Sequence, residues 1–193
     1  MSYNLSAQRG IKWGSLKLRH TVLAVLAATT AVVAVLLGSS AAFASTSTTG
    51  FGFIAPNISG ASGAVFLTGG GAFDSTTGFV HAGGGFKCTA SVSSGPLAGC
   101  MAGQGVRWGA ASLLNSTPFK CTATDPSGVK TATTTKNTAV LRTNFFRAGD
   151  GNHESFTANA IVSTNDIAPD VPGIQNAWVQ GVGCGSALVH FSR

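Results

Sequence analysis

The chain has 193 residues, with 12 Lys and Arg, six Asp and Glu, and a formal net charge of +6 at pH 7. Four of the basic residues and none of the acidic ones lie in the first 44 residues, so residues 45–193 carry a net charge of only +2. The basic residues of this remainder are scattered singly, whereas a nucleic-acid-binding protein is expected to show a basic stripe. The charge pattern therefore excludes nucleic acid as the expected partner.

Residues 1–44 have the three-part pattern of a secretion signal. The basic residues come first and are Arg9, Lys12, Lys17 and Arg19. An apolar run follows at 21–37, and Ala42 and Ala44 supply the small residues of a cleavage site. We predict a helical signal peptide that is cleaved between Ala44 and Ser45, and a secreted protein.

The alternative is an uncleaved N-terminal anchor, because a mainly apolar run of seventeen residues is just long enough for a membrane-spanning helix. The rest of the chain is then still outside the cytoplasm. We expect the protein to contact the membrane only through this segment. A cleaved signal peptide would do so only before cleavage.

All four cysteines follow the predicted cleavage site, at Cys88, Cys100, Cys121 and Cys184. An even number of cysteines in an exported chain predicts two disulfides, and four cysteines allow three pairings. Zinc sites need closely spaced ligand pairs, which these spacings do not provide. We therefore expect structural disulfides and no metal.

The clearest local pattern predicts a β-hairpin, in which residues 64–74 and 79–89 flank a turn at 75–78. A four-residue loop pairs Asp74 with Phe79 and then Phe73 with Val80. With this register, one face of the hairpin is entirely apolar, Gly or Cys, and a slip of one residue would destroy the sorting. Two glycine triplets, 69–71 and 83–85, fall side by side and predict a tightly bent sheet.

This hairpin carries a glycine-rich motif made of Gly69, Gly71, Phe73, Gly78, Val80, Gly83, Gly84 and Phe86. The motif resembles that of a group of exported bacterial all-β proteins without an assigned activity. In this chain Phe79 separates Gly78 from Val80, which departs from the spacing of the group. The resemblance implies a barrel-like fold and transfers no site residue.

A second hairpin is predicted from residues 138–148 and 153–163, which flank the turn Gly149–Asn152. Its register pairs Phe145 with Phe156 and Leu141 with Ala160, and again leaves one apolar face. Residues 177–191 are expected to form one long terminal strand. No amphipathic helix of useful length follows the signal.

These elements predict an all-β protein, namely a small antiparallel β-barrel of about eight strands, with a β-sandwich as the alternative. The expected organisation is a signal peptide at 1–44, an extended leader at 45–60 and a single all-β domain at 61–193. Phe51, Phe53 and Ile54 of the leader could dock as a first strand.

No motif in the chain specifies a reaction. His81, His153 and His190 are the candidates for acid–base chemistry, but the catalytic geometry of such residues is not visible in a sequence.

Asp150, Asn152 and Glu154 alternate like the start of a calcium loop, but the ligand series ends there, so a turn is expected. Asp166 and Asp170 are predicted turn residues, with an acidic rim as the alternative. Trp108 and Trp178 are expected in the core, with a ligand pocket as the alternative.

The expected function is therefore that of a non-enzymatic, disulfide-bonded binding protein without cofactor. Its partner would be a small apolar ligand or a component of a cell surface. The alternative is an enzyme of hydrolase or cyclase type, in which one of the three histidines acts with a carboxylate at the barrel mouth. Oligomeric state is not predicted.

Overall fold

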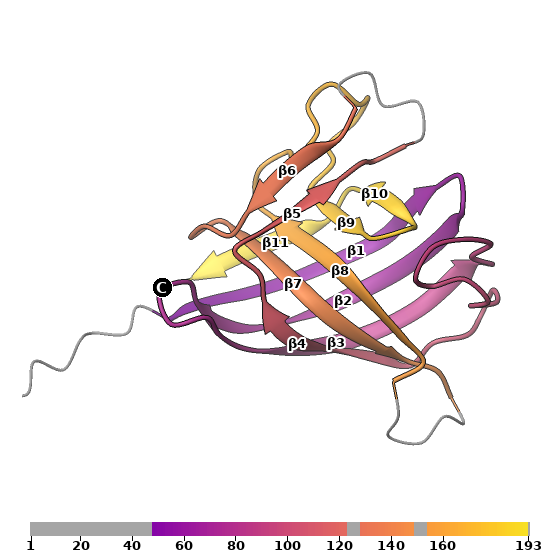
Figure 1. Ribbon diagram of the computed structural model, residues 1–193, viewed down its shortest axis with the longest axis horizontal. Helices are drawn as coiled ribbons and strands as arrows, with labels where there is room; N and C mark the ends of the chain where they lie inside the picture. The colour runs from indigo at the N-terminus through magenta and orange to yellow at the C-terminus, as the bar shows by residue number, and fades with distance from the viewer. Residues whose placement is uncertain (1–47, 123–127, 149–153, 193) are drawn as a thin grey trace, which may run out of the picture. The chain divides into compact units, whose positions relative to one another are not determined.

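The structure is a computed structural model that describes residues 48–122, 128–148 and 154–192 (Figure 1). Over these ranges the chain forms eleven β-strands and no helix. The strands are β1 (Thr49–Gly60), β2 (Gly63–Asp74), β3 (Phe79–Ala90), β4 (Arg107–Leu113), β5 (Ser116–Phe119), β6 (Lys130–Thr133), β7 (Thr138–Phe146), β8 (Phe156–Ser163), β9 (Ala177–Val179), β10 (Gly183–Gly185) and β11 (Leu188–Ser192). The predicted all-β class is confirmed. The predicted signal peptide, with Ala42, Ala44 and Ser45, lies outside the described residues.

Nine strands form one antiparallel sheet that closes into a ring. The order around it is β1, β2, β3, β4, β7, β8, β9 and β10, and β10 pairs back with β1 through Ser59 and Cys184. β11 continues along the same side of β1, where Leu188 lies opposite Ile54. The ring thus has eight positions, as predicted, with β10 and β11 sharing one. Hydrogen-bonded pairing runs all the way around it, which disfavours the two facing sheets of a β-sandwich.

Both predicted hairpins form in the predicted registers. β2 and β3 pair Asp74 with Phe79 and Phe73 with Val80, and the two glycine triplets lie side by side. β7 and β8 pair Phe145 with Phe156. The turn between β7 and β8 lies outside the described residues.

Asp74 holds the turn of the first hairpin. Its Oδ1 accepts a hydrogen bond from the backbone N–H of Thr76 at 2.8 Å and a longer one from that of Thr77 at 3.4 Å. The bond from Thr76 is the main reason that the pKa of Asp74 lies below its ordinary value. A side chain that caps its own turn in this way favours the turn over an extended chain.

The structure differs from the sequence analysis at both ends of the domain. Residues 49–60, which belong to the predicted leader, form β1 and are paired on both sides, with β2 and with β10 and β11. The predicted single terminal strand at 177–191 is wrong, since it breaks into β9, β10 and β11. The first of the two breaks, between β9 and β10, contains Gly181, whose positive φ of 79° is a backbone conformation that favours glycine.

The inward faces of the ring form a hydrophobic core rich in aromatic side chains. Its large buried aromatic members are Phe51, Phe53, Phe73, Phe86, Trp108 and Phe145. The ring centroids of Phe86 and Phe145 are 4.7 Å apart, and those of Phe53 and Trp108 are 5.9 Å apart. Trp108 also donates a hydrogen bond from Nε1 to the carbonyl oxygen of Thr68 at 2.9 Å. Trp108 is therefore a core residue, as predicted.

The glycine triplets permit close approach of the backbones of β2 and β3. A Cβ atom built at Gly84 would overlap the carbonyl oxygen of Thr68, and one at Gly71 would overlap that of His81. Gly69 in addition has a φ of 152°, which side-chain-bearing residues rarely adopt. Close packing of the two strands therefore accounts for these glycines.

Candidate functional site

The structure does not bring the predicted catalytic residues together. His81 on β3 and His190 on β11 are both exposed. Within the described ranges, neither histidine side chain forms a hydrogen bond or ion pair with a carboxylate. His153, Asp150 and Asn152 lie outside the described residues, and Glu154 is exposed. The described part of the chain also holds no group of three or more potential metal ligands.

The four cysteines form two disulfides, as predicted, and the structure selects one of the three pairings. Cys88 on β3 bonds Cys100 in the following loop, and Cys121, just after β5, bonds Cys184 on β10. The first bridge belongs to the inner core, whereas the second lies in a separate hydrophobic cluster. The second bridge therefore fastens the β5–β6 hairpin to the ring.

The separate cluster lies on the outer side of the sheet. Alternation along β7 and β8 turns Leu141 and Ala160 toward the inner core, and Val140 and Ile161 toward this outer cluster. The remaining buried members of the outer cluster are Phe119, Cys121, Ala132, Ala168, Trp178 and Cys184. The β5–β6 hairpin thus covers part of the outer face and creates a second, smaller core there.

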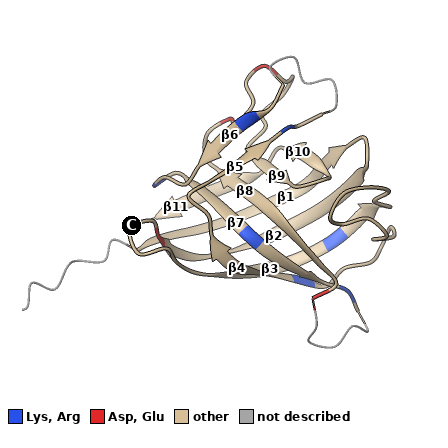
Figure 2. Ribbon diagram, viewed as in Figure 1, with Lys and Arg blue, Asp and Glu red and all other residues tan. Residues whose placement is uncertain are grey.

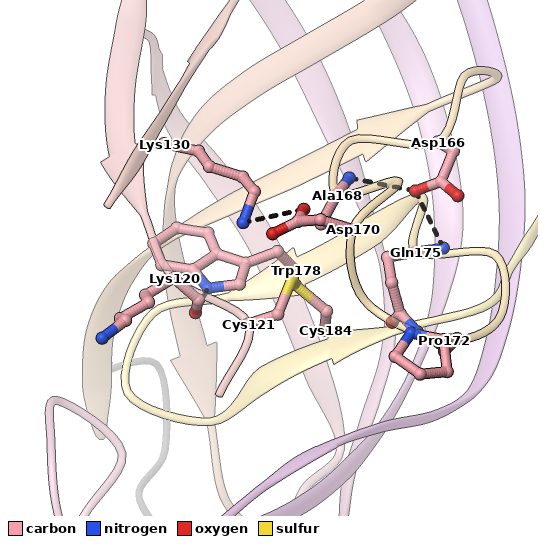
Figure 3. Close-up of a disulfide and its surroundings, with 10 residues drawn as sticks. All are labelled: Lys120, Cys121, Lys130, Asp166, Ala168, Asp170, Pro172, Gln175, Trp178 and Cys184. Atoms are coloured by element: carbon pink, nitrogen blue, oxygen red, sulfur yellow. Dashed lines mark hydrogen bonds and ion pairs between the residues drawn. A yellow bond between two sulfur atoms is a disulfide. The ribbon is translucent and has the colours of Figure 1, made fainter. Parts of the chain in front are cut away.

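Trp178 connects the hairpin to the sheet (Figure 3). Its Nε1 donates a hydrogen bond to the carbonyl oxygen of Lys120 at 2.9 Å, and its ring meets that of Phe119 edge-on at 5.9 Å. Only 4% of Trp178 is exposed. Trp178 is a core residue, as predicted, although it belongs to the outer cluster.

The loop between β8 and β9 closes over the same region. Lys130 on β6 forms an ion pair with Asp170 of this loop at 3.1 Å (Figure 3). Asp166 accepts hydrogen bonds on Oδ1 from the backbone N–H groups of Ala168 at 2.9 Å and Gln175 at 3.3 Å. Asp166 is therefore a turn residue, as predicted, and Asp170 ties the loop to the hairpin.

A cleft of about 410 Å³ opens beside Trp178 and the second disulfide. Four segments line it, namely the β1–β2 turn, the end of β5 with the stretch that follows it, the residue just before β6, and β9 with the turn to β10. Its lining residues are Ala61, Ser62, Pro118, Phe119, Lys120, Cys121, Thr122, Val129, Trp178, Gln180, Gly181, Val182 and Gly183. Most of the exposed lining is apolar, and Val129 at its edge is 69% exposed. This is the candidate site.

Charge is not concentrated at the cleft. Figure 2 shows the basic residues distributed over several strands, including β3, β4, β6 and β7. The polar lining comes mainly from Ser62, Lys120, Thr122 and Gln180. The cleft is therefore built to contact an apolar body at a small number of polar points.

Trp178 and the cysteines could be recognised from the sequence, but the cleft itself could not. One local signal marks the segment after β5: the tetrapeptide Phe86–Thr89 is repeated as Phe119–Thr122. Each copy places a buried phenylalanine two residues before a disulfide cysteine. The other lining segments have no shared motif.

No protein-family model matches the chain, and neither a curated protein nor a solved structure matches it. The resemblance of the first hairpin to exported bacterial all-β proteins stays a prediction. Among the described residues, none belongs to a helix long and apolar enough to span a bilayer.

Proposed function

We propose that this chain is an exported, disulfide-stabilised binding protein that takes a small, largely apolar ligand in the cleft beside Trp178. The observation that carries this proposal is an open, largely apolar cleft of about 410 Å³ with a small number of polar groups. Ligand sites in proteins have volumes of roughly 300–1,000 Å³ and this type of lining.

The cleft walls are held in place before a ligand arrives. The second disulfide, the hydrogen bond from Trp178 to Lys120 and the ion pair between Lys130 and Asp170 all join the hairpin to the ring or to its loops. A preformed site binds more tightly than a mobile one, because less conformational freedom is lost on binding. This favours a role in binding rather than a purely structural one.

A neutral apolar fluorophore, N-phenyl-1-naphthylamine, tests the site. We expect wild-type protein to bind it and Val129→Ser to weaken binding by about tenfold, because a valine contact is worth on the order of 1.5 kcal/mol. The matched control is Leu188→Ser, which changes an exposed leucine on β11 outside the cleft, where 78% of the side chain is accessible. Fluorescence titration of the three proteins gives the affinities. If Leu188→Ser rather than Val129→Ser weakens binding, the outer sheet face and not the cleft is the binding surface.

Export forms the second part of the proposal. It is supported by the three-part pattern of residues 1–44 and by two disulfides, which are compatible with an extracellular protein. We expect the mature protein to begin at Ser45. Intact-mass analysis of protein from the culture medium and from the membrane fraction measures this directly, and a full-length N-terminus in the membrane fraction would indicate the anchored form instead.

A further inference from the structure

Gln180 occupies a fixed position at the edge of the cleft. Its backbone N–H donates to the carbonyl oxygen of Asn159 at 2.9 Å, and its side-chain Oε1 accepts from the backbone N–H of Asn159 at 3.0 Å. Asn159 is itself held, since its Nδ2 donates to Thr117 Oγ1 at 3.0 Å. Two bonds between the same pair of residues set the direction of the Gln180 carboxamide.

These hydrogen bonds use only the oxygen of the Gln180 carboxamide and leave its nitrogen unused. Because Oε1 accepts from the N–H of Asn159, Nε2 is the end of the carboxamide left for another partner, and within the described ranges Nε2 forms no hydrogen bond. Ser62, another polar lining residue, already shares its hydroxyl with Ser94 at 2.7 Å. A carboxamide nitrogen carries two donor hydrogens and no acceptor.

We propose that the cleft selects ligands that combine an apolar body with a hydrogen-bond acceptor, and that Gln180 Nε2 is the donor that binds this acceptor. The inference rests on the proposed function and specifies the ligand class of the same site. A carbonyl oxygen on an aromatic or alicyclic body has this chemistry. A pure hydrocarbon fills the same space but leaves the amide donor without a partner, which costs affinity when the site is desolvated.

A matched pair of ligands tests the inference by displacement of N-phenyl-1-naphthylamine. 2-Acetylnaphthalene carries a carbonyl acceptor, and 2-isopropylnaphthalene has nearly the same shape without one. Gln180→Glu keeps an oxygen for the N–H of Asn159 and replaces the donor with a second acceptor. Gln180→Met removes both polar atoms and introduces no charge. Thr122→Val is the control, because it removes another uncharged side-chain donor lining the cleft.

We expect both Gln180 variants to weaken ketone binding by about five- to tenfold and to change hydrocarbon binding by less than about twofold. Thr122→Val should leave the ratio of the two affinities unchanged. Equal losses for ketone and hydrocarbon in both Gln180 variants would overturn the inference, as would wild-type protein that binds the fluorophore but neither naphthalene. Wild-type protein that does not bind the fluorophore contradicts the proposed function itself, so the two failures are distinguishable.

Discussion

Removing the Cys121–Cys184 disulfide is expected to lower the free energy of unfolding by about 4 kcal/mol, the larger effect of the two disulfides. The two cysteines are 63 residues apart in the chain, and the bridge restricts this long loop in the unfolded state. The double substitution Cys121→Ala and Cys184→Ala also removes the covalent link between the β5–β6 hairpin and β10, so fluorophore binding should be lost at urea concentrations well below the midpoint of global unfolding. Urea unfolding, monitored by tryptophan fluorescence without reductant, gives the stability.

The matched control is the substitution of Cys88 and Cys100 by alanine. These cysteines are only 12 residues apart, so the same reasoning gives a loss of about 3 kcal/mol. All four cysteines are buried, and therefore both double variants lose similar packing. Because Cys88 and Cys100 lie in the inner core and away from the cleft, their removal should leave binding by the folded protein intact. A greater loss of stability in the Cys88 and Cys100 variant, or unchanged binding in the Cys121 and Cys184 variant, would contradict this account.

The hairpins were predictable because their information is local. In β2–β3 and β7–β8 the register follows from a short turn, and it is confirmed by the separation of apolar from polar positions on two faces. The same alternation exists in β1, where Phe51, Phe53 and Ala55 are buried. The sequence allows Phe51, Phe53 and Ile54 to dock as a first strand but does not require it, because Gly, Ser and Thr dominate the surrounding residues and this composition also suits an extended leader.

Closure of the ring was not predictable in the same way. It depends on contacts such as Ser59 with Cys184, which join residues more than a hundred positions apart. No turn connects these partners, so no local register constrains them. The break at Gly181 was missed for a related reason, since a glycine in an apolar run also suits a bent strand.

The cleft depends on the same long-range contacts. Its lining residues, which include Ser62, Phe119 and Gln180, come from four separate segments of the chain that no common motif connects. Sequence spacing indicates a site only when its residues are supplied by one element or by a fixed motif. The disulfide pairing is long-range too, because Cys121 and Cys184 are 63 residues apart and Cys184 lies on β10, which also pairs with β1.

Replacing Gly84 with alanine is expected to destabilise the protein by about 3 kcal/mol, and Gly71→Ala should have a similar effect. In both cases the added Cβ meets a backbone carbonyl oxygen of the neighbouring strand, that of Thr68 or that of His81. A backbone atom inside a paired sheet cannot rotate away as a side chain can, so the strands themselves must separate. Neither glycine has a positive φ, and the loss therefore measures the close approach of β2 and β3 alone.

Gly52→Ala and Gly109→Ala are the matched controls for these variants. Both glycines lie in strands of the same ring, but a Cβ at Gly109 would meet no atom within 4 Å, and one at Gly52 only the carbonyl oxygen of Gly69 at 3.9 Å. We expect these two substitutions to be neutral or to stabilise by about 0.4–1 kcal/mol, because alanine reduces the conformational freedom of the unfolded chain. Urea unfolding of the four variants separates the two groups. Equal effects would show that β2 and β3 are not held this close, and would remove the physical reason for the glycine triplets.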